Sequence, residues 1–246
     1  MNTMSIDLGL GDMFKATIIK RPSATCKSPY VADIQLENSD EIVLAHTPAL
    51  GCKGLSDKGA TVYVSKIKDA KGVCKYRVQL GECYDTIIGL NPKLAENIVE
   101  QSIMKSGRVK KYMREKTVLH SRFDFIGTDK DNNKFVLEVK TVPLINEEKI
   151  AYFPDGYRKK KTEPVSPRAL KHLNDLIQIV KETNKRCIMC YVIQRSDTEK
   201  FIPSDNDPIY KSKFYEAIEA GVEIKTLFVH WNKNGQYIMN DYSEFC

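Results

Sequence analysis

The stretch "SRFDFIGTDKDNNKFVLEVK", residues 121–140, decides how the second half of the chain is interpreted. It holds a β-prone run at 121–126 and the start of another that continues to residue 142, and the polar segment "GTDKDNNK" separates them. Short apolar runs joined by a segment rich in Asp, Asn and Gly are typical of a β-hairpin. The stretch therefore predicts two antiparallel strands.

The register of this hairpin determines which charged side chains meet. If the turn is centred on Asp131, Asp124 lies directly across from Glu138, and Arg122 lies across from Lys140. Alternation along a strand places Arg122 and Asp124 on one face, and it does the same for Glu138 and Lys140. The opposite, buried face takes the apolar side chains Phe123, Phe125, Leu137 and Val139.

Two carboxylates that face each other across about 5 Å of sheet repel unless a cation lies between them. Asp and Glu oxygens are the ligands that Mg²⁺ and Mn²⁺ prefer, and Mg²⁺ often takes only one or two protein carboxylates. A neighbouring lysine polarises or deprotonates the attacking water and stabilises the charge that gathers on phosphorus. The pattern of Asp124, Glu138 and Lys140 thus indicates phosphodiester hydrolysis.

Two other interpretations of these residues stay open. Arg122 and Lys140 can pair with the two carboxylates in an ordinary surface hairpin, and the pattern alone weighs this nearly evenly with a metal site. A carboxylate pair also serves glycosidases, but that chemistry uses neither the adjacent lysine nor the basic clusters of this chain.

The region before residue 90 has the pattern of a small all-β domain. Residues 38–40 predict a hairpin turn between the second and third strands, and five or six strands of this length suit a small β-barrel. The expected strands are residues 14–20, 30–37, 41–47, 60–68, 75–80 and 85–90.

At Asn91 the pattern changes to that of a helix, which predicts a domain boundary near residue 90. Asn91 is a plausible N-cap, Pro92 fits the first helical position, and Gly107 ends the segment. One apolar stripe runs along it: Leu94, Ala95, Ile98, Val99 and Ile103.

Strands then alternate with helices, the order expected of a layered α/β domain. Ser166 caps a helix that begins at Pro167, and Arg168 and His172 lie on the side away from its core stripe. That stripe is Leu170, Leu173, Ile177 and Val180. The expected strands are 118–126, 135–142, 187–194 and 223–230, and the expected helices are about 167–183 and 208–220.

The composition, 42% hydrophobic and 28% charged, is that of a folded globular protein. No apolar run approaches the ~18 residues of a membrane helix, and the N-terminus lacks a signal-peptide pattern, so we expect a cytoplasmic protein with no membrane partner. The seven cysteines are expected to be reduced thiols. Cys187 and Cys190 form a C-x-x-C within an expected buried strand, which favours a core role over zinc binding.

The net charge of +6 and the pI near 8.8 favour polyanionic partners. Two basic clusters stand out, residues 105–116 and 157–161, and each includes a tyrosine that can stack on a base or sugar. These clusters favour nucleic-acid contact over loops that are merely solvated.

The spacing of Asp124 and the Glu138-Val139-Lys140 triplet is similar to the PD-(D/E)xK nuclease core. Most of the chain, from about Phe14 to Val229, also resembles the sugar fermentation stimulation protein A family. The resemblance rests on ordered blocks: "SRFDF", "VLEVKTV", "AYFPD", "RALKHL", "VIQRSD", "FIPSDNDPIY" and "AGVEI".

This resemblance implies a fold of two parts. The first, residues 1–90, is an OB-like β-barrel that binds nucleic acid. The second, residues 91–246, is a PD-(D/E)xK restriction-endonuclease-like α/β domain. The family is described as DNA-binding proteins or presumed DNA/RNA nucleases.

The resemblance also implies roles for individual residues. Asp124 and Glu138 are the implied ligands of Mg²⁺ or Mn²⁺, with the backbone carbonyl of Val139 as a third ligand and Lys140 as the catalytic lysine. Glu100, on the helix that opens the second domain, matches the extra acidic residue of such cores, and a solvated helix-edge glutamate is the equal alternative.

The sequence departs from the family pattern in three places. In the barrel segment "HTPALG", Ala49 and Leu50 replace a polar pair, so any ligand contact of those side chains is lost. Leu170 stands where a glutamine is common, and extra residues, including "YRKKKTEPV", precede this helix. The insertion adds a basic arm beside the site or simply lengthens a loop.

DNA is the expected partner and RNA a second candidate, while the oligomeric state, a dimer included, stays open. A DNA-binding regulator that keeps the nuclease scaffold without turnover is the alternative to a nuclease, because spacing cannot establish activity. The basic side chains expected to contact nucleic acid are Arg122, Arg158, Lys159, Lys160, Arg168, Lys171 and His172.

Overall fold

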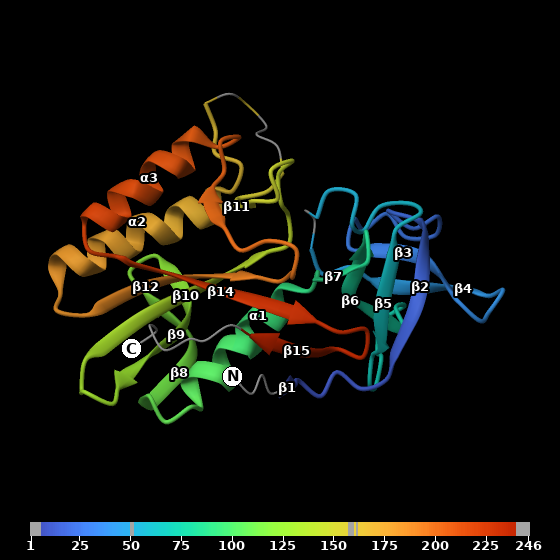
Figure 1. Ribbon diagram of the computed structural model, residues 1–246, viewed down its shortest axis with the longest axis horizontal. Coiled ribbons are helices and arrows are strands. Elements are labelled where there is room, and N and C mark those ends of the chain that lie inside the picture. The colour runs from blue at the N-terminus through green and yellow to red at the C-terminus, as the bar shows by residue number, and fades with distance from the viewer. Residues whose placement is uncertain (1–5, 50–51, 157–159, 161, 240–246) are drawn as a thin grey trace. The chain divides into compact units, whose positions relative to one another are not determined.

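The computed structural model describes residues 6–49, 52–156, 160 and 162–239, which form two compact units of mixed α/β structure (Figure 1). The first unit contains the residues up to Leu94, together with Gln194–Glu199 and Phe228–Met239. The second contains Ala95–Ile193 and Lys200–Leu227.

The first unit is built on a six-stranded sheet in the order β4-β3-β2-β5-β6-β7. Strand β4 also pairs in parallel with β6, so the run of strands from β4 to β6 returns to its own first strand. All six expected strands and the turn after the second one are confirmed, because apolar residues alternate along them as they do in half-buried strands. The bounds are β2 Met13–Lys20, β3 Val31–Leu36, β4 Ile42–His46, β5 Thr61–Lys66, β6 Tyr76–Cys83 and β7 Thr86–Gly89.

Short strands from the two chain ends complete this unit. Strand β1 (Ile6–Asp7) pairs with β15 (Gln236–Met239), which pairs with the last residues of β14 (Glu223–Trp231). Gly89 packs against this part of the chain, since a Cβ at Gly89 would lie 2.1 Å from Oε1 of Gln194 and 2.8 Å from Nε1 of Trp231.

The helix expected after Asn91 is present as α1 (Pro92–Val99), and its last turn, η1 (Glu100–Met104), is π-helical. The side chain of Asn91 accepts a hydrogen bond from the backbone N–H of Lys93, 3.1 Å away, as an N-cap does. Every member of the expected apolar stripe is buried, which confirms the helix, whereas the π turn was not expected.

The sheet of the second unit runs in the order β14-β12-β10-β9-β8. Strands β8, β9 and β10 are antiparallel neighbours, and β10 and β12 are parallel. Helix α2 packs on β12, and helix α3 packs on α2 (Figure 1). The bounds are β8 Val109–Val118, β9 Ser121–Asp129, β10 Lys134–Val142, β11 Ala151–Phe153, α2 Pro167–Glu182, β12 Arg186–Ile193, β13 Phe201–Pro203 and α3 Pro208–Glu219.

The register of the β9–β10 hairpin is the expected one. Leu137 pairs with Phe125, and Lys134 pairs with Thr128, which centres the turn on Asp131. The antiparallel ladder ends at the Leu137–Phe125 pair, one step before Asp124 and Glu138 would face each other. The two carboxylates therefore lie where the strands stop exchanging regular backbone hydrogen bonds.

The expected strand at 118–126 is wrong in its bounds. Residues up to Val118 belong to β8, a strand that the sequence did not predict, and β9 begins only at Ser121. Most residues of β8 are at least partly exposed and many are charged, so β8 lacks the apolar alternation by which a strand is recognised.

The expected core stripe of α2 is also partly wrong. Leu173 and Ile177 are buried, but Leu170 and Val180 are only half-buried. The buried face instead includes His172 and two further polar or small positions, because polar side chains that have partners can point inward. Its members are Ala169, His172, Leu173, Asp175, Leu176, Ile177 and Ile179.

Within the described ranges, no helix is long and apolar enough to cross a membrane. Cys187 and Cys190 are buried free thiols of β12, as the core interpretation of the C-x-x-C predicts. Burial raises the pKa of Cys187 to about 12, so this thiol carries its proton at neutral pH.

Candidate functional site

Asp124 joins β9 to β10 at the point where their ladder ends. Its Oδ2 accepts a hydrogen bond from the backbone N–H of Val139, at 2.7 Å. Burial, and then the negative charge of Glu138, raise the pKa of Asp124 to about 7, although the Val139 bond acts in the opposite direction. The carboxyl group therefore titrates near neutral pH.

Glu138 lies in a buried polar cluster with Lys140 and His172. Only 2% of Glu138 is exposed, and its Oε1 accepts a hydrogen bond from Nζ of Lys140, 2.5 Å away. Nδ1 of His172 contacts the same oxygen and lies 3.1 Å from the lysine Nζ. Residues 138 and 172 thus meet across 34 positions of sequence, where β10 faces α2.

The two contacts of His172 Nδ1 require different protonation states of that nitrogen. Its Nδ1 either donates to Glu138 or accepts from Lys140, since a ring nitrogen carries a proton or a lone pair but not both. Burial alone would raise the pKa of Glu138, but the charge of Lys140 and the contact with His172 outweigh burial and lower it. Glu138 is therefore held as a carboxylate, whereas the neighbouring Asp124 takes up a proton near neutral pH.

The second carboxylate oxygen of Glu138, Oε2, is buried and has no hydrogen-bond partner among the described residues. An unpaired buried oxygen of an ionised carboxylate is costly, and a cation or a water satisfies it. No group of three His, Cys, Asp or Glu side chains in the described part of the chain has the arrangement of a metal cage. The residues present therefore fit a hard cation held by two carboxylates and completed by water or phosphate, and they do not fit a closed structural site.

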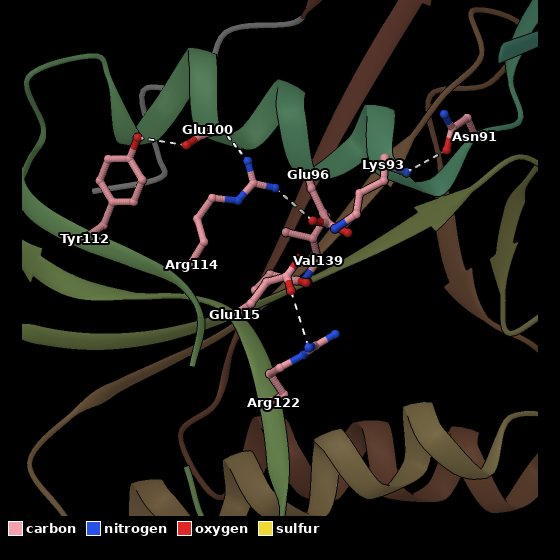
Figure 2. Close-up of polar contacts among 10 residues, drawn as sticks. Asn91, Lys93, Glu96, Glu100, Tyr112, Arg114, Glu115, Arg122 and Val139 are labelled. Carbon is pink, nitrogen blue, oxygen red and sulfur yellow. Dashed lines mark hydrogen bonds and ion pairs between the residues drawn. The ribbon is translucent and has the colours of Figure 1, made fainter. Parts of the chain in front are cut away.

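The helix glutamates differ in what they contact (Figure 2). Glu100 accepts a hydrogen bond from the Tyr112 hydroxyl at 3.0 Å and pairs with Arg114. Glu96, one turn earlier, also pairs with Arg114, at 3.0 Å, and its charge raises the pKa of Asp124. The structure therefore links Glu96 electrostatically to Asp124, while Glu100 has two protein partners.

Glu96 was not predicted from the sequence. A signal was available, because positions four apart lie on the same face of a helix, and residue 96 precedes the predicted Glu100 by one such step. The family pattern that suggested Glu100 concerned only the presence of an acidic residue on this helix.

The described basic residues that were expected to bind nucleic acid contact different parts of the chain. Figure 2 shows Arg122 pointing toward Glu115, with which it forms an ion pair at 3.5 Å. Nζ of Lys171 donates to the backbone carbonyl of His120, Lys160 pairs with Glu163 at 3.6 Å, and Arg168 is exposed. Arg158 and Lys159 lie outside the described residues.

The expectation that His172 lies on the side of α2 away from its buried face is corrected. His172 is 3% exposed, and its ring lies 5.7 Å from that of Phe123, centroid to centroid. Because its Nδ1 contacts Glu138, the residue belongs to the carboxylate cluster rather than to the surface of α2.

Comparison with known proteins covers both sequence and fold. The family model described as "Sugar fermentation stimulation protein RE domain" matches residues 89–235. A sugar fermentation stimulation protein homolog of Nitrosococcus oceani is 32% identical, over 79% of this chain and 83% of that protein. A homolog of Crocosphaera subtropica is 34% identical, over 79% of this chain and 81% of its own.

A solved structure shares the fold of this protein. It is that of Pyrococcus furiosus SfsA in complex with Ca²⁺, with a TM-score of 0.77 and 23% sequence identity, covering 98% of this chain and 96% of that one. The match of the family model to more than half of the chain and the identity to the curated relatives lead to the same conclusion: this chain belongs to the sugar fermentation stimulation protein family.

Proposed function

We propose that this protein binds DNA and hydrolyses its phosphodiester bonds with a divalent cation held by Asp124 and Glu138. The observation that carries the proposal is the state of these two carboxylates. Glu138 is buried with one oxygen unpartnered among the described residues, and its charge helps to raise the pKa of Asp124 to about 7. A divalent cation between the two carboxylates would offset their repulsion and occupy the unpartnered oxygen.

The side chains around the pair have separate tasks in this proposal. Lys140 and His172 orient Glu138 through Oε1, which leaves Oε2 for a cation. The Val139 N–H holds Asp124 through Oδ2, and the backbone carbonyl of Val139 is a further candidate ligand. Lys140, 12% exposed at its side chain, also carries the positive charge that stabilises a phosphorane-like transition state.

A cation bound there, Mg²⁺ or Mn²⁺, would polarise a phosphoryl oxygen and lower the pKa of the attacking water. The relative from Pyrococcus furiosus was solved in complex with Ca²⁺, and Ca²⁺ and Mg²⁺ both take oxygen ligands. Glu96, whose charge already acts on Asp124, is the helix carboxylate we assign to this site, with Glu100 as the alternative.

For the first unit we propose an OB-like barrel that contacts nucleic acid. The support is the additional pairing of β4 with β6, which gives the five strands β4-β3-β2-β5-β6 a closed order. Five-stranded barrels of this kind bind oligonucleotides on an exposed face. The second unit would then correspond to the PD-(D/E)xK nuclease-like domain.

The test is cleavage of labelled single- and double-stranded DNA and RNA in Mg²⁺, Mn²⁺ or EDTA. Glu138→Gln and Lys140→Met keep the size of each side chain and remove its charge. Glu148→Gln, an exposed glutamate of the same unit, is the matched control. We expect the wild type to cleave only in the presence of metal. Both site variants should lower the cleavage rate by at least about a hundredfold, the scale of a lost charge contact in the transition state, and the control should keep the wild-type rate.

Binding of Ca²⁺ or Mg²⁺ by calorimetry supplies a readout that does not depend on turnover. Glu138→Gln should abolish it. Tight, salt-sensitive nucleic-acid binding without cleavage under any metal would reject the nuclease and leave a DNA-binding regulator on this scaffold.

A further inference from the structure

Three lysines of the second unit form one row across its sheet. In the ladders of β9, Thr128 pairs with Lys111 of β8 on one side and with Lys134 of β10 on the other. Lys185 directly precedes Arg186, which pairs with Phe135, so it continues the row beside Lys134. Residues in cross-strand register share a face of the sheet, and strands lie about 5 Å apart.

The row borders a hollow of about 370 Å³ with an apolar floor. In the next cross-strand row, Met113 of β8 pairs with Ile126 of β9, and 55% of Met113 is exposed. A Cβ at Gly127 would lie 2.4 Å from the backbone carbonyl oxygen of Lys111 and 2.7 Å from the Phe135 ring, so only a glycine fits between these two groups. Apart from Lys185, the residues that line the hollow belong to β8, β9 and β10, so the hollow lies on the sheet rather than between loops.

The three ammonium groups lack carboxylate partners among the residues that the structure describes. Two carboxylates near the same strand ends, Asp129 and Glu223, are both engaged by Arg186, at 2.9 and 2.8 Å. No acidic side chain lines the hollow within the described ranges. Like charges in one row repel, so this surface is suited to an anion.

We propose that the hollow binds the phosphate backbone of a nucleic-acid strand, at a contact separate from the carboxylate site. Lys111 and Lys185 are three strand spacings apart, or about 15 Å, which matches a chain of phosphates better than a single anionic group. The apolar row beside the lysines offers a surface for sugars and bases. This inference rests on the proposed nucleic-acid function and adds a surface to it.

The contact with the hollow is expected to position the nucleic-acid strand relative to Asp124 and Glu138. Lys134 precedes Glu138 by four residues of β10, or about 13 Å along the strand. Lysine contacts to phosphates carry no sequence information, so the hollow should raise affinity equally for all sequences.

The experiment is the salt dependence of binding for the variant Lys111→Gln/Lys134→Gln/Lys185→Gln. Each lysine that neutralises a phosphate contributes about 0.9 to the slope of log K against log salt for duplex DNA and about 0.7 for single strands. We expect the slope to fall by about 2 to 3 and the affinity at about 0.15 M salt to weaken at least tenfold. Met113→Glu, a single exposed change, should weaken binding in the same direction.

The control variant is Lys149→Gln/Lys181→Gln/Lys211→Gln, which removes the same charge from exposed or half-exposed lysines of the same unit outside the hollow. It should leave the slope within experimental error of the wild type. If the hollow variant also keeps the wild-type slope while the wild type binds and cleaves, the hollow is not a phosphate contact and the proposed function stands. If the wild type binds no nucleic acid, both proposals fail together.

Discussion

The surroundings of Asp124 strongly change the pH at which its carboxyl group ionises. Its pKa is raised from 3.8 to about 7, by burial first and then by the charge of Glu138. The folded protein therefore holds this proton more tightly than the unfolded chain does. Between these two values the unfolded state binds fewer protons, so the contribution of Asp124 to stability falls as pH rises and is fully lost above about pH 7.

Asp124→Asn should remove this loss. Asn keeps an acceptor for the Val139 N–H but carries no charge. In EDTA at about pH 8, the free energy of unfolding of the variant should therefore exceed that of the wild type by roughly 2 to 4 kcal/mol, because each pKa unit corresponds to about 1.4 kcal/mol. The gap should close toward about pH 4. Urea denaturation at both pH values measures it, with the exposed Asp131→Asn as control. A gap that is the same at both pH values would contradict this account of Asp124.

Gly89→Ala tests a close approach of backbone to side chain. The added Cβ would lie 2.1 Å from Oε1 of Gln194, far inside van der Waals contact, so the buried side chains of Gln194 and Trp231 have to shift. We expect a loss of about 1 to 3 kcal/mol, the usual cost of overpacking. Gly72→Ala is the matched control, because nothing lies within 4 Å of a Cβ there, and thermal melting of the two variants should separate them.

At the scale of elements, the two long helices of the second unit begin with similar caps that differ in burial. The hydroxyl of Ser166 accepts from the N–H of Ala169 at 3.3 Å, at the start of α2. Asp207, which is fully buried, accepts from the N–H of Tyr210 at 3.0 Å and from that of Val165 at 2.7 Å. Asp207 thus joins the start of α3 to the segment that leads into α2.

Asp207→Ala should therefore cost more than Ser166→Ala. We expect about 1 kcal/mol for the serine, a typical N-cap value, and about 2 to 4 kcal/mol for the aspartate, since its loss leaves two backbone donors unsatisfied. Denaturant titration of both variants measures the difference. Equal losses would mean that the bond to Val165 contributes nothing.

At the scale of the whole molecule, the first unit is assembled from segments far apart in sequence. The N–H of Gly89 donates to the carbonyl of Gln194 at 2.9 Å, and Lys233 pairs with Glu82 at 2.8 Å. Strand β1 pairs with β15. A unit of this kind needs its late segments in order to complete its packing.

A fragment that ends at Leu94 lacks those segments, and we expect it to melt at least about 10 °C below the full-length protein, or without a cooperative transition. A loss of about 1 kcal/mol shifts the melting temperature of a domain of this size by roughly 4 to 8 °C, and the fragment loses several contacts. Circular dichroism of the fragment and of the full chain measures this. A fragment that melts as high and as sharply as the full chain would show that the late segments are dispensable.

Much of the local structure follows from the sequence because it depends on near neighbours. The alternation of apolar residues identified the strands of the first unit, and the cap at Asn91 identified α1. The hairpin register followed from the polar turn around Asp131, since a turn fixes which residues face each other. Strand β8 was missed because its mostly exposed, charged residues carry no such pattern.

The site was predictable only in part. The sequence suggested Asp124, Glu138 and Lys140 as a group, and the structure brings Lys140 to Glu138 and the Val139 N–H to Asp124. The sequence did not indicate that His172 is buried, because a polar residue on a helix is expected to be exposed unless its buried partner is known.

Propensity, periodicity and turn chemistry act over a few residues, and for this reason the strands of the first unit, the capped helices and the register of the β9–β10 hairpin are all encoded locally. Tertiary packing brings His172 to Glu138, lets Arg114 link Glu96 to Glu100, and places lysines of three segments in one row. These contacts join residues distant in sequence. They depend on how the strands pair and how α2 packs on the sheet, and no local pattern of residues encodes that packing.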